Sequence, residues 1–252
     1  MDLIPILIAV PAVMAVILPL IRGAKVRGIV VYIGAGCIMA LSLITLGGWL
    51  AGGAQTLHLY VHTELVDHAM TLADLFLMWL IIYMGVKYRR ILVILLSVAQ
   101  TGLLMYVEFT TQMPEAYHMM LDGLSMLMCM IIAIVGSLIC IYTVGYMKGY
   151  HNHHKEYKDR QPFFFSMVFL FLSAMFGLVL SQSLIWMYFF WEITSVISFL
   201  LIGYTQTDEA IHNSFTALWM NLLGGLGFSV AIALLALNTG SVQLSDAIAF
   251  GG

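Results

Sequence analysis

Long apolar runs alternate with short polar loops along the whole chain. A helix needs about 20 apolar residues to cross the hydrocarbon core of a bilayer, with a range of roughly 17–25. Runs of this length predict eight membrane spans, in chain order: Leu3–Ile21, Gly28–Leu50, Met70–Val86, Ile91–Val107, Leu121–Met147, Phe163–Leu180, Ser183–Tyr204 and Ser214–Leu237. The third and fourth spans are short and contain Asp74 and Gln100, so one re-entrant or tilted hairpin is the alternative for this pair. The pattern predicts an all-α integral membrane protein with about eight transmembrane helices.

The composition supports this fold class. The sequence is 62% hydrophobic and only 9% charged, whereas a soluble domain carries about 25% charged residues. Cys37, Cys129 and Cys140 all lie within apolar segments and lack the spacing of a metal site. We therefore expect neither a disulfide nor an iron–sulfur site.

The positive charges predict an orientation in the membrane. The ten Lys and Arg residues fall in three loops: Arg22, Lys25 and Arg27; Lys87, Arg89 and Arg90; and Lys148, Lys155, Lys158 and Arg160. With eight spans, these loops all lie on one side, and the opposite loops carry acidic residues without basic ones. Because loops rich in Lys and Arg stay in the cytoplasm, we expect a multi-pass protein of a prokaryotic inner membrane with both termini outside.

Glu192 is the strongest candidate functional residue. It lies near the middle of the seventh span, with Tyr188 four residues before it and Ser195 three residues after it on the same helical face. A carboxylate in the hydrocarbon core costs several kcal/mol unless it is paired or neutralised. Since no Lys or Arg lies inside any predicted span, either a partner subunit supplies a cation or Glu192 is protonated much of the time. The second alternative is what a reversible proton carrier requires, so we expect Glu192 to have a functional role.

Small and weakly polar residues form stripes on two other spans. One stripe contains Ser166, Ser173 and Gly177, and the other contains Ala217, Asn221, Gly225 and Ser229. Such stripes let membrane helices approach closely, so helix packing is the simpler explanation for both. Asn221 is nevertheless included among the candidate residues of a proton path.

Most of the remaining polar residues have simpler explanations. Two groups of histidines, His58, His62 and His68 and then His151, His153 and His154, are predicted to lie in solvated loops; a metal site is the alternative for the second group. We interpret Asp122 as the N-cap of the fifth span and Asp74 and Glu108 as interfacial residues. His212, at the inner mouth of the last span, could titrate near neutral pH and pass protons.

Sequence motifs of soluble enzymes are missing. The sequence contains no phosphate-binding loop, dinucleotide fingerprint, nucleophile elbow or zinc motif. We therefore expect a non-catalytic membrane subunit that holds no cofactor or metal and binds no nucleic acid. Its expected surroundings are membrane lipid and other membrane subunits.

Three motifs resemble a known family. They are Leu121-Asp122-Gly123-Leu124-Ser125, the ending Tyr142…Gly145-Tyr146-Met147, and Phe190-Trp191-Glu192-Ile193-Thr194-Ser195…Leu200-Leu201-Ile202-Gly203-Tyr204. They are similar to the antiporter-like subunits of respiratory complex I, energy-converting membrane-bound hydrogenases and multisubunit Na⁺/H⁺ antiporters. The segment from Asn221 to Gly227 also resembles the next helix of that family. In the family the matching glutamate belongs to the proton path, so the resemblance implies this role for Glu192.

The resemblance also implies a domain organisation. Residues 1–110 would be N-terminal membrane helices that include an extra pair at 70–107. Residues 111–240 would form the first part of the antiporter-like core, and residues 241–252 an external tail. Family members continue with a helix carrying a buried lysine and with an inverted repeat of the same unit. We therefore expect one half of the repeat, completed by a second chain that supplies the other half and its lysine. The alternative is a fragment, or a degenerate subunit that only packs against the complex.

The sequence leaves three functional hypotheses. The first is an ion-translocating subunit, for H⁺ or Na⁺, of a redox-driven pump such as a membrane-bound hydrogenase or complex I-like assembly. The second is a structural or assembly subunit of the same complex with no ion path of its own. The third, an independent small-solute transporter, ranks last because half of an inverted repeat offers no enclosed path.

Overall fold

The protein is described by a computed structural model that covers residues 3–59, 64–110, 118–153 and 159–251. The chain forms two compact units, each built from separate stretches of sequence. Unit 1 consists of Met1–Leu57, Leu121–Leu180 and Gly203–Thr207. Unit 2 consists of His58–Met120, Ser181–Ile202 and Asp208–Gly252.

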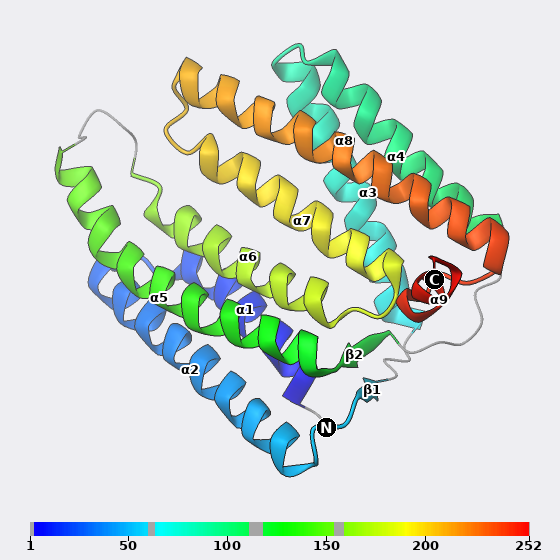
Figure 1. The fold of residues 1–252 in the computed structure, drawn as a ribbon. Helices are drawn as coiled ribbons and strands as arrows, with labels where there is room; N and C mark the ends of the chain where they lie inside the picture. Colours follow the sequence, from blue (N-terminus) through cyan, green and yellow to red (C-terminus); the bar gives the residue numbers. More distant parts are fainter. Residues whose placement is uncertain (1–2, 60–63, 111–117, 154–158, 252) are drawn as a thin grey trace. The chain divides into compact units, whose positions relative to one another are not determined.

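The described residues form eight helices that are long and apolar enough to cross a membrane. They are α1 (Leu3–Ile17, extended by the short 3₁₀ helix η1, Leu18–Leu20), α2 (Ala24–Ala51), α3 (Glu64–Lys87), α4 (Ile91–Thr110), α5 (Gly123–His153), α6 (Gln161–Leu180), α7 (Leu184–Ile202) and α8 (Asp208–Thr239) (Figure 1). A short helix α9 (Leu244–Gly251) follows. The predicted all-α membrane fold is confirmed, and the third and fourth spans correspond to the helices α3 and α4, each of which is long and apolar enough to cross a membrane.

Several helices continue beyond their apolar segments. Helix α5 runs to His153 and α8 begins at Asp208, whereas the apolar pattern predicted boundaries at Met147 and Ser214. The reason is that hydropathy detects the part of a helix that suits hydrocarbon, while backbone hydrogen bonding continues into the polar flank. The predicted loop positions of His151 and His153 are therefore wrong, since both belong to the last turn of α5. The predicted loop position of His68 is wrong for the same reason, since His68 lies in the first part of α3.

Unit 1 is held together by close helix packing between α1 and α6, α2 and α5, α5 and α6, and α1 and α2. Hydroxyl groups of one helix donate to backbone carbonyls of another: Ser166 Oγ to Ala15 O at 2.5 Å, and Ser173 Oγ to Ile8 O at 2.8 Å. Small residues permit this approach. The packing interpretation of the stripe on α6 is therefore confirmed for Ser166 and Ser173.

The start of α5 also agrees with expectation. The Ser125 backbone N–H donates to Asp122 Oδ1 at 2.7 Å. This is the hydrogen bond of an N-cap residue, which satisfies one of the free donors in the first turn of a helix.

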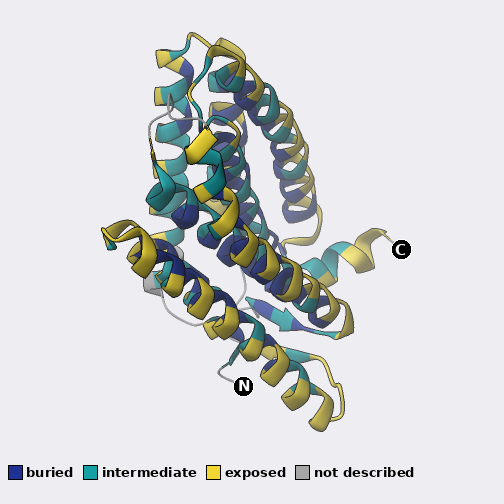
Figure 2. Cartoon of the chain, turned by 90° about the vertical axis from the view of Figure 1, so that its left-hand side faces the viewer, coloured by how far each residue is buried: buried dark blue, intermediate teal, exposed yellow. Residues whose placement is uncertain are grey.

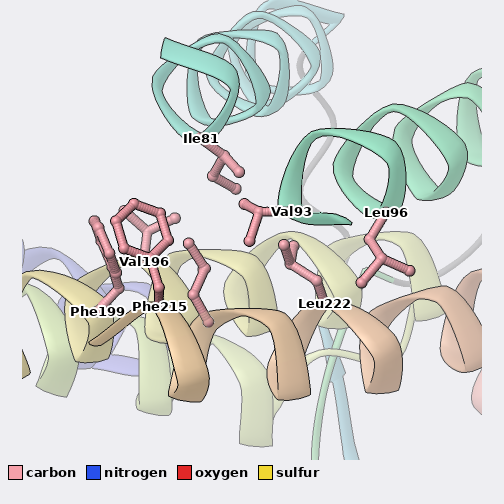
Figure 3. Close-up of a cluster of buried hydrophobic side chains, with 8 residues drawn as sticks. Ile81, Val93, Leu96, Val196, Phe199, Phe215 and Leu222 are labelled. Carbon is pink, nitrogen blue, oxygen red and sulfur yellow. The ribbon is translucent and has the colours of Figure 1, made fainter. Parts of the chain in front are cut away.

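Unit 2 contains α3, α4, α7, α8 and α9. Helix α8 packs along α4 and α7, and α3 packs against α4 and α7. One apolar cluster joins these four helices, with residues from each of them: Ile81, Val93, Leu96, Val196, Phe199, Phe215, Leu218 and Leu222 (Figure 3). The helix pair α3–α4 is thus attached to α7 and α8 by burial of apolar side chains.

A second apolar cluster lies nearer the other end of α4, α7 and α8. It includes Val107 of α4, Leu184 of α7 and Ile232 of α8. Short backbone bridges at this end join Met119 to Ser181 and Ser183 to Gln243. Gln100 of α4 and Glu192 of α7 lie on stretches of helix between the two clusters.

Strands β1 (Leu57–Leu59) and β2 (Met119–Leu121) pair in a two-stranded sheet. Elsewhere, buried residues line one side of the helices and exposed residues the other (Figure 2). Many of the exposed residues are apolar, such as Ile33 and Ile44 on α2 and Leu127 and Leu138 on α5. Exposed apolar faces of this extent suit contact with lipid hydrocarbon or with another membrane subunit.

Candidate functional site

Glu192 lies on α7 in the interior of unit 2, where only 4% of its surface is exposed. Its Oε1 atom accepts a hydrogen bond from Gln100 Nε2 at 2.5 Å and another from Tyr188 OH at 3.0 Å. Tyr188 is placed there by the helix period, one turn before Glu192. Gln100 comes from α4, which the packing of α4 against α8 brings to this position.

The donors to this carboxyl group are uncharged. No ion pair involving Glu192 occurs within the described parts of the chain. An amide and a phenol stabilise a carboxylate by hydrogen bonding without neutralising it. The site can therefore hold either form of Glu192, because a protonated carboxyl group still accepts hydrogen bonds.

Sequence analysis missed Gln100 as a partner of Glu192. The signal was present, since Gln100 is a polar side chain within a short apolar span. Its amide is now 1% exposed, and its Oε1 atom has no hydrogen-bond partner among the described residues. What the sequence could not supply was the pairing of α4 with α7 and α8.

Gly225 of α8 makes room for this amide. A Cβ atom added at Gly225 would lie 2.7 Å from Gln100 Oε1 and 3.6 Å from Tyr188 OH. Contacts under about 3 Å force a neighbour to move, so only glycine fits this position without displacing Gln100. The small residue in the stripe on α8 therefore helps to shape the site as well as the packing of the helix.

Ser195 and Asn221 lie beside the carboxyl group rather than bonded to it. Both line a small cavity together with Glu192, Gln100 and Gly225. The Ser195 hydroxyl donates to the backbone carbonyl of Trp191 at 3.1 Å, on its own helix. The structure thus brings four of the predicted residues together: Glu192, Tyr188, Ser195 and Asn221.

His212, the fifth predicted residue of the proton path, does not lie beside Glu192. It is exposed near the start of α8, where Arg90 Nη2 lies 3.4 Å from its Nδ1 atom. Nine residues of helix separate it from Asn221, a rise of about 14 Å at 1.5 Å per residue. His212 therefore lies at one end of unit 2, and its part in a proton path stays a prediction.

A second cavity adjoins Glu192 on the side toward the start of α7. It is lined by residues of α3, α4 and α7: Thr71, Asp74, Thr101, Leu104, Met105, Glu108, Ile185, Tyr188 and Glu192. Asp74 and Glu108, which the sequence analysis treated as separate interfacial residues, line one cavity with Glu192. Thr71 Oγ1 donates to Glu108 Oε1 at 3.0 Å and so ties α3 to α4.

The histidines that were predicted to be solvated differ in their surroundings. His151, in unit 1, is half-buried: its Nδ1 lies 3.0 Å from Met147 O, and its Nε2 lies 3.6 Å from Asp159 Oδ1. His62 and His154 lie outside the described residues. Over the parts of the chain that the structure describes, no three His, Cys, Asp or Glu side chains are grouped to hold a metal ion.

Two family models match the chain. Residues 111–157 match the N-terminus of chain 5 of NADH-ubiquinone oxidoreductase (complex I). Residues 181–250, which include the Glu192 site, match the transmembrane region of NADH:quinone oxidoreductases and Mrp antiporters.

Individual proteins that are similar in sequence are also antiporter subunits. The chain is 32% identical over 158 residues to Na(+)/H(+) antiporter subunit A1 of Staphylococcus haemolyticus, a match covering 62% of this chain and 19% of the relative. The subunit A1 of Staphylococcus aureus strain JH9 is 35% identical over 129 residues, or 51% of this chain and 15% of the relative. The chain thus spans about a fifth or less of the length of these relatives.

A solved structure shares the fold. The membrane-bound sulfane sulfur reductase, an archaeal respiratory membrane complex, contains a chain that matches with a TM-score of 0.63 at 15% identity. The match covers 98% of this chain and 39% of that one. The fold is that of a multi-pass membrane protein. Over the matching segments the chain is similar to antiporter-like subunits of complex I and Mrp antiporters, as its motifs predicted.

Proposed function

We propose that this chain is an ion-translocating subunit of a redox-driven pump, such as a membrane-bound hydrogenase or a complex I-like assembly, and that Glu192 is its buried protonatable carboxyl group. The observation that carries the proposal is a mid-helix carboxyl group, 4% exposed, held by the uncharged donors Gln100 and Tyr188. The relation to Na⁺/H⁺ antiporter subunits and to a respiratory membrane complex supports ion translocation.

In this proposal Glu192 alternates between its acid and carboxylate forms. A cation approaching the site favours the charged form, and withdrawal of the cation favours the acid. The cation would be the lysine of a second chain that continues the inverted repeat, with protons as the transported ion. Because the described residues show no cation paired with Glu192, the switching charge would come from outside the described part of this chain.

The proposed orientation places both termini outside a prokaryotic cell membrane. Lys87, Arg89 and Arg90 then face the cytoplasm between α3 and α4, as the positive-inside rule requires. The start of α7 and the end of α4 face outside. Cysteines introduced at exposed loop positions would test this orientation through their labelling by a membrane-impermeant thiol reagent.

The test of function is the substitution Glu192→Gln in the assembled complex, reconstituted in vesicles. We expect ion pumping to fall by about 100-fold or more, as when a positioned proton-transferring side chain is lost, while the complex still assembles. Glu209→Gln, at the exposed start of α8, is the matched control and should pump normally.

A second candidate is a structural subunit without its own ion path. The favouring observation is that Gln100 and Tyr188 already satisfy Glu192 Oε1, as they would for a carboxyl group with only a packing role. Under this hypothesis the Glu192→Gln complex pumps at the normal rate. That single measurement separates the two candidates.

A further inference from the structure

The second cavity beside Glu192 has features that helix packing does not explain. Its lining on α4 runs from Thr101, next to Gln100, to Glu108, near the end of the helix. Seven residues of helix correspond to a rise of about 10 Å. The cavity therefore connects the level of the buried Glu192 with the exposed side chain of Glu108.

Asp74 lies along this connection. It projects from α3, three residues after Thr71, whose hydroxyl is bonded to Glu108. Its Oδ1 atom is buried and has no hydrogen-bond partner within the described part of the chain. An unpaired carboxyl oxygen in an interior costs free energy unless it meets a proton or a water molecule.

Thr101 provides an independent observation. Its side chain is 6% exposed, lines the same cavity, and leaves Oγ1 without a partner in the described regions. The cavity has an internal volume of about 20 Å³ open to water, and a volume of about 10–15 Å³ is enough for one water molecule when polar partners surround it. Thr101, Asp74 and Tyr188 provide such partners.

We propose that Asp74 is a second proton-carrying carboxyl group, in a route that joins Glu192 to Glu108 at the end of unit 2 where α7 begins. In each step a water molecule in the cavity accepts the proton of Glu192 and gives one of its own protons to the Asp74 carboxylate. Glu192 is left as a carboxylate that Gln100 and Tyr188 still hold. Asp74 passes its proton in the same way toward Glu108, and the water is regenerated.

Among the described residues that line the cavity, only acidic and phenolic groups can titrate, and none is a cation. The titratable groups lining the cavity are Asp74 on α3, Glu108 on α4, and Tyr188 and Glu192 on α7. Helix α8 packs on α4 and α7, and its titratable residues Asp208, Glu209 and His212 all lie near its start. The proposal rests on the proposed function of Glu192 and adds the path by which its proton leaves or arrives.

The experiment compares Asp74→Asn with Asp208→Asn, the same chemical change at an exposed position outside the cavity. Both are measured in the reconstituted complex, next to Asp74→Glu, which restores the carboxyl group. We expect Asp74→Asn to lower proton pumping by about 10- to 100-fold, Asp74→Glu to recover a large part of it, and Asp208→Asn to have no effect. A merely structural role would not be rescued by the longer acid.

A second readout does not depend on pumping. Dicyclohexylcarbodiimide modifies protonated carboxyl groups in apolar surroundings, and mass spectrometry locates the product. We expect modification of Asp74 in the unaltered complex, including when Na⁺ is present. Protection of Asp74 by Na⁺ would overturn the proton route in favour of a sodium site.

The outcomes also separate this proposal from the proposed function. If Asp74→Asn pumps normally while Glu192→Gln does not, the route is wrong and the role of Glu192 stands. If Glu192→Gln pumps normally, the proposed function fails and the route fails with it.

Discussion

Units 1 and 2 provide examples of two different uses of buried polar side chains. In unit 1, hydroxyl groups such as those of Ser137, Ser166 and Ser173 each donate to a backbone carbonyl of a neighbouring helix. In unit 2, polar side chains meet one another around Glu192, and several of their atoms have no partner among the described residues. The contrast shows that polarity inside a membrane helix is an insufficient sign of function.

What separates the two cases is whether the hydrogen-bonding capacity is used up. A hydroxyl that donates to a carbonyl of a packed helix acts as an attachment point. A carboxyl group with uncharged donors, next to a cavity lined by further carboxyl groups, retains the capacity to gain and lose a proton. The following substitutions would break or sharpen this distinction.

Among these further substitutions, the largest effect is expected from Gln100→Leu. This substitution keeps a similar volume but removes the 2.5 Å hydrogen bond to Glu192. Loss of a hydrogen bond to a charged group costs about 1.5–3 kcal/mol, so the charged form of Glu192 is disfavoured. We expect the pumping rate of the reconstituted complex to fall by about tenfold or more, since about 1.4 kcal/mol corresponds to tenfold.

The matched control for Gln100→Leu is Ser97→Ala. Ser97 is fully buried on the same helix, and its hydroxyl has no hydrogen-bond partner in the described residues. It lines neither cavity beside Glu192. Equal losses of pumping in both variants would show that any change in α4 disturbs the complex. That result would contradict a specific role for the hydrogen bond from Gln100 to Glu192.

A smaller effect is expected from Gly225→Ala. The added Cβ would lie 2.7 Å from Gln100 Oε1, so the amide must shift or rotate, at a cost of about 1–3 kcal/mol for overpacking. Gly224→Ala is the control, because its Cβ would meet only Trp191 Cζ2 at 3.8 Å. For both variants we would measure the pumping rate and the thermal stability of the complex. Similar behaviour of the two would contradict the proposed fit of Gln100 against Gly225.

The smallest effect is expected in unit 1, from Ser173→Ala. It removes the hydrogen bond to Ile8 O, and such interhelical bonds contribute about 0.6 kcal/mol on average in a membrane protein. We expect a slight loss of thermal stability and an unchanged pumping rate per assembled complex. A strong loss of pumping without loss of assembly would show that the polar groups of unit 1 also take part in translocation.

Much of this molecule was accessible from the sequence. Apolar runs of membrane length predicted the eight spans, because the thickness of the hydrocarbon core sets the length of a spanning helix. The N-cap at Asp122 and the neighbourhood of Tyr188 and Glu192 were also predictable, since both depend on contacts within a few residues along one helix. The motif around Glu192 indicated the similarity to antiporter-like subunits.

Residues from distant spans were harder to connect. Asp74 and Glu108 looked like separate interfacial residues, and Gln100 was only a polar residue in a short span. Their shared surroundings depend on which faces of α3, α4, α7 and α8 pack together. Helical period fixes the face on which a side chain lies but leaves open which helix covers that face.

The sequence by itself determined that this protein spans the membrane with about eight helices and places one carboxyl group deep in the seventh. Hydrophobicity and helical spacing are local properties, and they are sufficient for both conclusions. Only the tertiary structure decided that Gln100 binds this carboxyl group and that Asp74 and Glu108 line a cavity beside it. Those contacts arise from helix packing, which joins residues about 26 to 118 positions apart in the chain through surfaces that no single helix encodes.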